Sequence, residues 1–367
     1  DRPSNFGDGV PKTATLPMLS LAALGVKTYM EFDDSMRQVQ ATLQASDSDM
    51  VQLTEAARQM GRDTRYSASE AAQAILAIGQ AGNDTAQTLA LLPTVLNTAQ
   101  ASGLSIDSVA EYMSQTVSIL GVGQDYIDDW ADQVNKTAAA ATVNQQQIFD
   151  AVTGAGDVGK MLKGGTVELL TMVGMLGQAG VQGAEAGTTI RALINKLSTA
   201  SERSDAAQVL SDLNVQITDS EGNLLEMNEI FGQFQQALQG MGNQQQVALM
   251  SKIFGEEYGS QALGLISKAG LSWETMSQQI NASQGVTEQM AQTMEGGLGG
   301  SMRSLQSAGE DVLITIGEKL APTMQYWSGV LTECANWMSG LDEGTWSLLG
   351  NLGALATALG VGSKVVG

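Results

Sequence analysis

Apolar residues recur every three or four positions along most of this 367-residue chain. The spacing is clear in Leu53, Ala57 and Met60, and strand-like alternation is nearly absent. Because residues three and four apart share one face of an α-helix, the pattern predicts an all-α protein whose helices each carry an apolar face. A chain of this length can form two or three ordinary domains or one extended helical body.

Small polar residues mark several helix starts. Ser67 and Glu70 fit a capping box, in which each side chain bonds the other residue's backbone N–H. Ser105, 38 residues after Ser67, and Thr142, 37 residues after Ser105, occupy similar places. The apolar segment that follows each of these starts ends near a glycine. This spacing predicts an irregular bundle of helical hairpins with a degenerate internal repeat.

Glycine is unusually frequent, with 42 residues in 367. The segment at 77–82 ends in Gly-Gln-Ala-Gly, and the segment at 175–180 repeats this ending after the same kind of apolar run. Glycine after an apolar helix adopts the left-handed conformation without steric cost, which favours helix ends; close helix packing is the alternative. We expect one or the other role for Gly79, Gly82, Gly177, Gly180, Gly183 and Gly187.

One stretch departs from the helical period. Residues 215–224 alternate around a turn-forming cluster, which predicts a small β-hairpin near residues 213–226. Asp219, Glu221 and Asn223 also resemble part of a calcium loop. The acidic residue that must close such a loop is missing at the right offset, so we expect a turn without a metal.

Four glycines in five residues then interrupt the pattern at Gly296, Gly297, Gly299 and Gly300. They remove backbone restriction and predict a hinge. A long C-terminal amphipathic helix should follow, with an apolar stripe that ends at Pro322. The members of the stripe are Met302, Leu305, Val312, Leu313, Ile316 and Leu320.

These patterns divide the chain into five parts. We expect an extended or helical lead-in over residues 1–30, which starts abruptly as a fragment of a longer protein would, and a helical core over residues 31–211. A second helical part with the β-hairpin should cover residues 212–295, followed by the hinge at 296–300. The amphipathic helix and an apolar C-terminal segment then occupy residues 301–367.

The composition excludes most hydrolase chemistry. The chain has no histidine, and Cys334 is its one cysteine, so the commonest general base, a cysteine metal cage and an intrachain disulfide are all absent. Residues 154–160 partly match a nucleotide-binding P-loop, but Met161 stands where a Mg²⁺-binding Ser or Thr is needed and the preceding segment has a helical pattern. We therefore expect no enzymatic activity, no cofactor and no metal.

The charge balance also limits the partners. Eighteen Lys and Arg stand against 39 Asp and Glu, for a formal charge of -21, so a basic surface for nucleic-acid phosphates is missing. We expect no specific nucleic-acid binding. The acidity keeps such a chain soluble, and a more specific interpretation is a surface that repels DNA moving past it.

The stretch from residue 347 to residue 363 is 17 uncharged residues, slightly short of the ~20 that a membrane span needs. It is a candidate membrane segment, with self-association or core packing as the alternatives. Its apolar members are Leu348, Leu349, Leu352, Leu355, Leu359 and Val361.

Several segments between residues 32 and 322 resemble, in family order, the conserved core of phage tail tape measure proteins. The most specific is the glycine-rich stretch from Gly180 to Arg191. Residues 253–255 (Ile-Phe-Gly) and 316–322 (Ile-Gly-Glu-Lys-Leu-Ala-Pro) are further examples.

This resemblance implies a structural, multicopy protein of the tail lumen or tail tip, assembled in the bacterial cytoplasm. Its implied partners are further copies of itself, the tail tube and tail tip or hub proteins, and the host membrane. Its implied roles are tail assembly, tail length determination and DNA ejection across the host envelope. The long repetitive helices of a ruler are absent from these residues, so this chain is not itself the measuring rod. The alternative is a phage-independent pore-forming or membrane-active helical protein.

Overall fold

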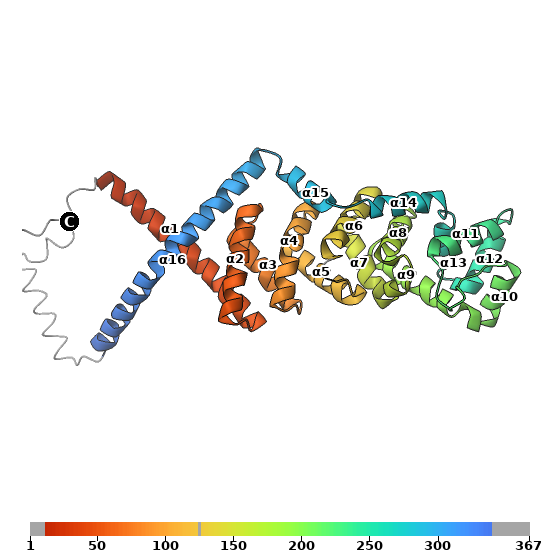
Figure 1. The fold of residues 1–367 in the computed structure, drawn as a ribbon, viewed down its shortest axis with the longest axis horizontal. Coiled ribbons are helices and arrows are strands. Elements are labelled where there is room, and N and C mark those ends of the chain that lie inside the picture. Colours follow the sequence, from red (N-terminus) through yellow and green to blue (C-terminus); the bar gives the residue numbers. More distant parts are fainter. Residues whose placement is uncertain (1–11, 124–125, 340–367) are drawn as a thin grey trace, which may run out of the picture. The chain divides into compact units, whose positions relative to one another are not determined.

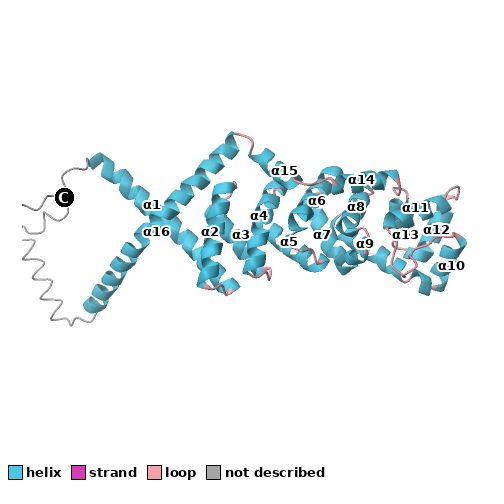
Figure 2. Ribbon diagram, in the orientation of Figure 1, coloured by secondary structure: helices cyan, strands magenta, loops and turns pink. Residues whose placement is uncertain are grey.

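A computed structural model describes residues 12–123 and 126–339, and this part of the chain forms sixteen α-helices and no strand (Figures 1 and 2). The all-α prediction is confirmed. The helices are α1 (Lys12–Leu43), α2 (Asp47–Asp63), α3 (Ala68–Gln80), α4 (Thr85–Ser102), α5 (Ile106–Leu120), α6 (Ile127–Ala140), α7 (Gln145–Ala155), α8 (Gly165–Gln178), α9 (Gly183–Ser198), α10 (Ser204–Asp212), α11 (Met227–Ala237), α12 (Asn243–Phe254), α13 (Gly259–Ile266), α14 (Leu271–Asn281), α15 (Val286–Glu295) and α16 (Leu298–Ser339).

The chain forms two compact units, and the larger comprises Glu31–Asp311. Within it, each helix from α2 to α8 packs against one or both of the next two helices in the sequence, and α10 to α13 form a group at one end of the unit (Figure 1). The chain then returns along this row, so that α14 lies on α6 and α8 and α15 lies on α4 and α6. Contacts between sequence neighbours therefore build the row, and contacts between distant segments close it.

The smaller unit combines Asp1–Met30 with Val312–Gly367. In its described part, α1 crosses α16 closely at Gly25 and Gly317, where a Cβ atom on Gly317 would overlap the Gly25 carbonyl oxygen. This gives a physical reason for the glycine in the segment at 316–322. Two helix backbones can approach so closely only where neither carries a side chain at the crossing point.

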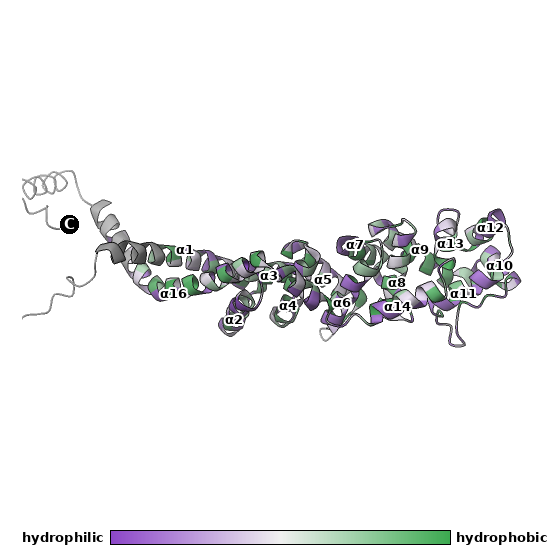
Figure 3. Cartoon of the chain, turned by 90° about the horizontal axis from the view of Figure 1, so that it is seen from above, coloured by the Kyte–Doolittle hydropathy of each residue, from purple (hydrophilic) through white to green (hydrophobic). Residues whose placement is uncertain are grey.

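Apolar side chains fill the space between the helices of the larger unit. Hydrophobic and hydrophilic residues both occur along the helices that are coloured in Figure 3. The largest fully buried side chains are aromatic, and burial of each such ring contributes roughly 1.5–3 kcal/mol to folding. They are Trp130, Phe149, Phe231, Phe234 and Phe254.

The helix starts agree in part with the sequence-based prediction. Ser67 caps α3 in a complete capping box with Glu70, and Ser105 caps α5, so both predictions are confirmed. The start predicted at Thr142 is wrong, because α7 is capped by Asn144. Asn144 and Gln147 form the reciprocal capping box there, and the Thr142 carbonyl oxygen accepts a hydrogen bond from Gln182 Nε2 at 2.6 Å.

The two echoed glycine segments share one division of roles. Gly82 and Gly180, which follow α3 and α8, have φ values of +95° and +89°, in the left-handed region that favours glycine. Gly79 and Gly177 lie inside those helices instead. A Cβ atom on Gly79 would lie 2.9 Å from a Leu43 methyl carbon, and one on Gly177 would overlap the Val143 side chain. The first glycine of each segment therefore allows close packing, and the last lets the chain turn.

The glycine-rich stretch at 180–191 brings α9 into backbone contact with α7. A Cβ atom on Gly187 would overlap the carbonyl oxygen of Ala151 and would lie 2.8 Å from the Gly154 Cα atom. Gly183, the first residue of α9, has a φ of +59°. Small residues on both helices are thus required where the two backbones meet.

We predict that Gly187→Ala destabilises the protein by roughly 1–3 kcal/mol, because the obstructing Ala151 atom is backbone and α7 must move away from α9. Thermal or urea unfolding measures the change. Gly232→Ala in α11 is the matched control, because a Cβ atom there meets nothing within 4 Å and alanine should stabilise the helix by about 0.5–1 kcal/mol. Equal effects of the two substitutions would contradict the packing role.

The β-hairpin predicted near residues 213–226 is wrong. The segment is a loop with one isolated bridge, between Thr218 and Leu224. Two backbone hydrogen bonds flank this bridge, from the Leu225 N–H to the Ile217 carbonyl oxygen at 3.0 Å and from the Asp219 N–H to the Asn223 carbonyl oxygen at 2.9 Å. Side chains bind other backbone groups of the loop: the Gln233 amide bonds both the N–H and the C=O of Gln216, at 2.8 and 3.0 Å. The Asp219 carboxylate accepts the N–H groups of Asn223 and Glu221, and these bonds lower the pKa of Asp219.

The alternation that suggested the hairpin has a different cause. Val215 and Ile217 are buried, and Gln216 between them is exposed. Alternate residues of this loop therefore face the helical core, with one isolated bridge in place of a regular hairpin. An isolated two-stranded hairpin would gain little stability of its own.

A buried carboxylate joins the starts of α8 and α11. Glu168 is 5% exposed and accepts the Gly164 N–H at 2.8 Å and the N–H of Met227, the first residue of α11. These bonds satisfy helix-start N–H groups that lack partners within their own helices. Burial nevertheless disfavours the charged form and raises the pKa of Glu168 above its ordinary value of 4.5.

We predict that Glu168 makes the protein less stable as the pH rises from 4.5 through its raised folded-state pKa. In this window the folded chain holds a proton that the unfolded chain has released, so deprotonation favours unfolding. Urea unfolding should show the stability of wild type relative to Glu168→Gln decreasing as the pH rises. Glu185→Gln, at an exposed position on α9, is the control and should show little such change. A relative stability that increases with pH would reverse the sign we infer.

Candidate interaction site on helix α16

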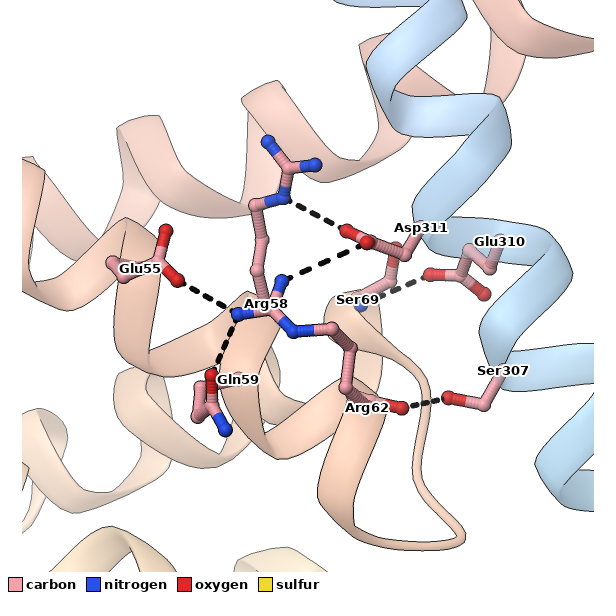
Figure 4. A network of polar contacts seen from close by, with 9 residues as sticks. Glu55, Arg58, Gln59, Arg62, Ser69, Ser307, Glu310 and Asp311 are labelled. Atoms are coloured by element: carbon pink, nitrogen blue, oxygen red, sulfur yellow. Dashed lines mark hydrogen bonds and ion pairs between the residues drawn. The ribbon is translucent and has the colours of Figure 1, made fainter.

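Residues 298–311 are the part of α16 that belongs to the larger unit, and we call them the first half of the helix. They are attached to the α2–α3 hairpin by three polar side chains, Ser307, Glu310 and Asp311, which we call the polar clasp (Figure 4). Ser307 is buried, and its hydroxyl donates to the carbonyl oxygens of Gly61 and Tyr66, the latter at 3.0 Å. Both carbonyls lie where α2 ends and α3 is about to begin. The hydroxyl therefore satisfies backbone groups that the helix ends leave free.

Glu310 supports the start of α3. Its carboxylate accepts the N–H of Ser69 at 3.0 Å, and Ser69 is the second residue of that helix. Negative charge at a helix N-terminus is favourable because it meets the positive end of the helix dipole. The helix α3 thus has one cap from its own sequence and one from α16.

Asp311 completes the clasp with an arginine pair. Arg58 Nε lies 2.8 Å from Asp311 Oδ1, and the two side chains are only 20% and 19% exposed. Arg62 lies 3.6 Å from the other oxygen of Asp311 and 2.7 Å from Glu55 on its own helix. The hydrogen bond to Glu55 raises the pKa of Arg62, so the guanidinium stays charged. These limited exposures make the Arg58–Asp311 pair stronger than an ordinary surface ion pair.

The corner between α15 and α16 contains the predicted hinge glycines. Gly296 and Gly297 connect the helices, whereas Gly299 and Gly300 lie in the first turn of α16. A Cβ atom on Gly300 would overlap the backbone carbonyl of Glu295. A hinge at these residues stays a prediction; the structure shows a tight corner that only a residue without a side chain fits at Gly300.

Charged side chains support this corner. Glu295 Oε1 accepts a hydrogen bond from Arg303 at 2.9 Å, and the Arg65 guanidinium lies 3.9 Å away. Arg65 also lies over the Tyr66 ring, 4.7 Å from its centroid. Both ends of the first half of α16 are therefore attached through paired polar groups.

The neighbouring helix α15 is attached in the same way. Asp132 of α6 is buried, and its carboxylate accepts the N–H groups of Gly285 and Thr287, at 2.5 and 2.8 Å, at the start of α15. Gln100 of α4 donates to the carbonyl oxygen of Ala291 at 2.7 Å. The returning part of the chain thus meets the helical row through buried polar contacts as well as apolar ones.

The apolar face of this part of α16 lies on the opposite side. Leu298, Met302 and Leu305 are 83%, 58% and 66% exposed. At about 100° per residue, Ser307 and Gly300 lie roughly opposite Leu298 around the helix. An amphipathic helix normally turns its apolar face toward the core. Here small and polar residues face the core, and the apolar residues face outward.

The structure adds two features to the predicted long helix. Met302, Leu305 and Val312 of the predicted stripe are exposed, its other members Leu313, Ile316 and Leu320 are half-buried, and Ile314, outside the stripe, is buried. The helix also continues past Pro322 to Ser339. Proline removes one backbone hydrogen bond inside a helix at a cost of about 3 kcal/mol, which a helix of 42 residues can tolerate.

The sequence reasoning missed the clasp because its residues look like ordinary charged helix faces. Arg58 and Asp311 are 253 residues apart, and neither position carries a local signal that identifies its partner. The Asp219 carboxylate, which resembled part of a calcium loop in the sequence, accepts backbone N–H groups of its own turn. Among the described residues, no group of three His, Cys, Asp or Glu side chains could hold a metal ion.

The candidate membrane segment, from Leu348 to Val361, lies outside the described residues. Within the residues that the structure describes, no helix is both long enough and apolar enough to cross a membrane.

We predict that Arg58→Ala and Asp311→Ala destabilise the protein non-additively, with a coupling energy of about 1–2 kcal/mol, because the pair is largely shielded from water. Urea unfolding of both single variants and the double variant measures the coupling. The Arg37–Asp33 pair, with side chains 66% and 32% exposed, is the control and should couple by less than about 0.5 kcal/mol. Additive effects at Arg58 and Asp311 would show that the clasp does not depend on this pair.

Comparison with known proteins identifies similar sequences. A family described as phage-related minor tail protein matches residues 54–255, which include Arg58, Arg62 and the glycine-rich stretch at 180–191. The tape measure protein of Pneumococcus phage Dp-1 is 24% identical over 330 residues, and a probable tape measure protein of Escherichia phage P2 is 29% identical over 340 residues. Each alignment covers 90% of this chain, which spans 28% and 42% of the length of these two relatives. No solved structure matches the chain.

Proposed function

Because the chain belongs to the family of phage-related minor tail proteins, we propose that its helical row is an assembly module of a tail tape measure protein. A structural role in the phage tail follows from the family itself. The observation that carries the finer proposal is that the family match, residues 54–255, falls entirely inside the larger unit, Glu31–Asp311. The helical core and second helical part predicted from the sequence also fall inside that unit.

We propose that the module is present in several copies in the tail lumen or at the tail tip, where it contacts tail tube and tail tip or hub proteins. The formal charge of -21 supports a position beside DNA without a binding role, since acidic surfaces repel phosphates. Tail length would be set by parts of the longer protein, because the chain spans less than half of either relative.

The attachment of α16 suggests how the module takes part in DNA ejection. Its first half meets α2 and α3 through hydrogen bonds and ion pairs to carboxylates, which water can replace at a net cost of about 1.5–3 kcal/mol per bond. Gly296 and Gly297 lie at the corner about which α16 would turn. We propose that α16 leaves the hairpin at this corner when the protein is ejected, ahead of the DNA. Contact of residues 347–363 with the host membrane would belong to the same step.

The test is an in-frame deletion of residues 31–311 from the full-length phage protein. We expect particles without tails, because the module supplies contacts that nucleate assembly, and electron microscopy of lysates distinguishes the outcomes. The wild-type gene supplied in trans should restore tails. Tails of normal length would contradict the proposal, and tails shortened in proportion would assign the deleted residues to the ruler instead.

A further inference from the structure

The outward apolar residues of α16 form a regular seam. Leu298, Met302 and Leu305 are spaced by four and then three residues, and Gly309 and Val312 continue the same spacing along the helix. A spacing of alternately four and three residues keeps apolar side chains on one line facing a second helix, as in a coiled coil. Isolated exposed apolar residues are common on protein surfaces and carry no such implication. Several large apolar side chains aligned on one helix face do imply a partner helix.

The polar clasp determines which way this seam faces. Ser307 and Asp311 bind the α2–α3 hairpin from the far side of the helix, and Glu310 binds it from the flank. Rotation of α16 to bury the seam against the hairpin would break all of these contacts. The seam therefore stays outward in the single chain.

The surroundings of the seam favour an identical partner. Most exposed residues beside it are small or uncharged, namely Ser301, Ser304, Gln306 and Ala308. Arg303, the one charged residue in this stretch of α16, is paired with Glu295. Of the nearby acidic residues, Asp311 lies on the opposite side of the helix, and the Glu310 carboxylate is bound by the Ser69 N–H.

Charge then decides between kinds of partner. Two copies of a chain with a formal charge of -21 repel each other over most of their surfaces, and they can approach most easily at a face free of acidic side chains. A basic partner would instead be attracted to the acidic faces, where it could form ion pairs. The small residues Ala308 and Gly309 also allow a second helix to come close.

We propose that the seam of Leu298, Met302 and Leu305 is the surface on which a second copy of this chain docks, with α16 packed against α16. The inference deepens the proposed function and rests on it, in that several copies must lie side by side in one tail. It assigns their contact to a specific helix face. It also gives the polar clasp a role in assembly, because the clasp presents the seam.

The first experiment compares three purified 367-residue chains by sedimentation equilibrium: wild type, Leu305→Asp and Leu271→Asp. Leu271 is the matched control, because it is 80% exposed on α14 and lies outside the seam. We expect wild type and Leu271→Asp to associate as the concentration rises and Leu305→Asp to remain a monomer. Circular dichroism verifies that all three are folded.

The second experiment tests direct contact. In a chain carrying Cys334→Ser, mild oxidation should link two copies through Leu305→Cys, whereas Leu271→Cys should give no more covalent dimer than the parent chain. Equal cross-linking at the two positions would overturn the proposal.

The remaining outcomes separate this inference from the tail function. Wild type that stays monomeric, or Leu305→Asp that associates like wild type, overturns the docking surface, and the phage deletion still tests the tail role on its own. If Leu305→Asp blocks tail assembly although the wild-type chain is monomeric, the seam binds a different tail protein and the proposal of a second copy is wrong.

Discussion

The polar clasp between α16 and the α2–α3 hairpin joins segments that are about 250 residues apart, and the arrangement of the returning chain depends on it. Ser307, Glu310 and Asp311 determine both where the first half of α16 lies and which of its faces points outward. Asp132 of α6 fixes the position of α15 in a similar way, because its carboxylate accepts N–H groups at the start of that helix. Without these contacts, nothing in the apolar pattern of α16 would keep Leu298, Met302 and Leu305 in water.

Two kinds of packing therefore coexist in the larger unit. The helices from α2 to α9 are joined by buried apolar side chains, and by glycines where α7 meets α9, so separating them exposes surface that water does not compensate. The first half of α16 is joined by polar groups, to which water can form hydrogen bonds once the helix has separated. Strength of attachment thus differs between the row and the segment that returns to it. A protein that must first assemble and then rearrange needs such a difference, and this is why we connect α16 with ejection.

The glycines that make the composition unusual serve distinct physical purposes. Gly82 and Gly180 adopt a backbone conformation that other residues rarely reach, whereas Gly187 and Gly317 leave space that a neighbouring backbone occupies. The conformational role can be predicted from the sequence, because such a glycine directly follows a helix. The packing role depends on which helix lies opposite, so it became visible only in the assembled structure.

The sequence alone determined the all-α class, the starts of α3 and α5 at Ser67 and Ser105, and the resemblance carried by residues 180–191, because local spacing and capping chemistry are short-range properties. It also identified an apolar stripe on α16, but not the direction in which the stripe faces. Only the tertiary structure decided that, together with the loop at 213–226 and the clasp between Arg58 and Asp311. Periodicity shows which residues share a face; what that face meets depends on partners hundreds of residues away, on which the local pattern carries no information.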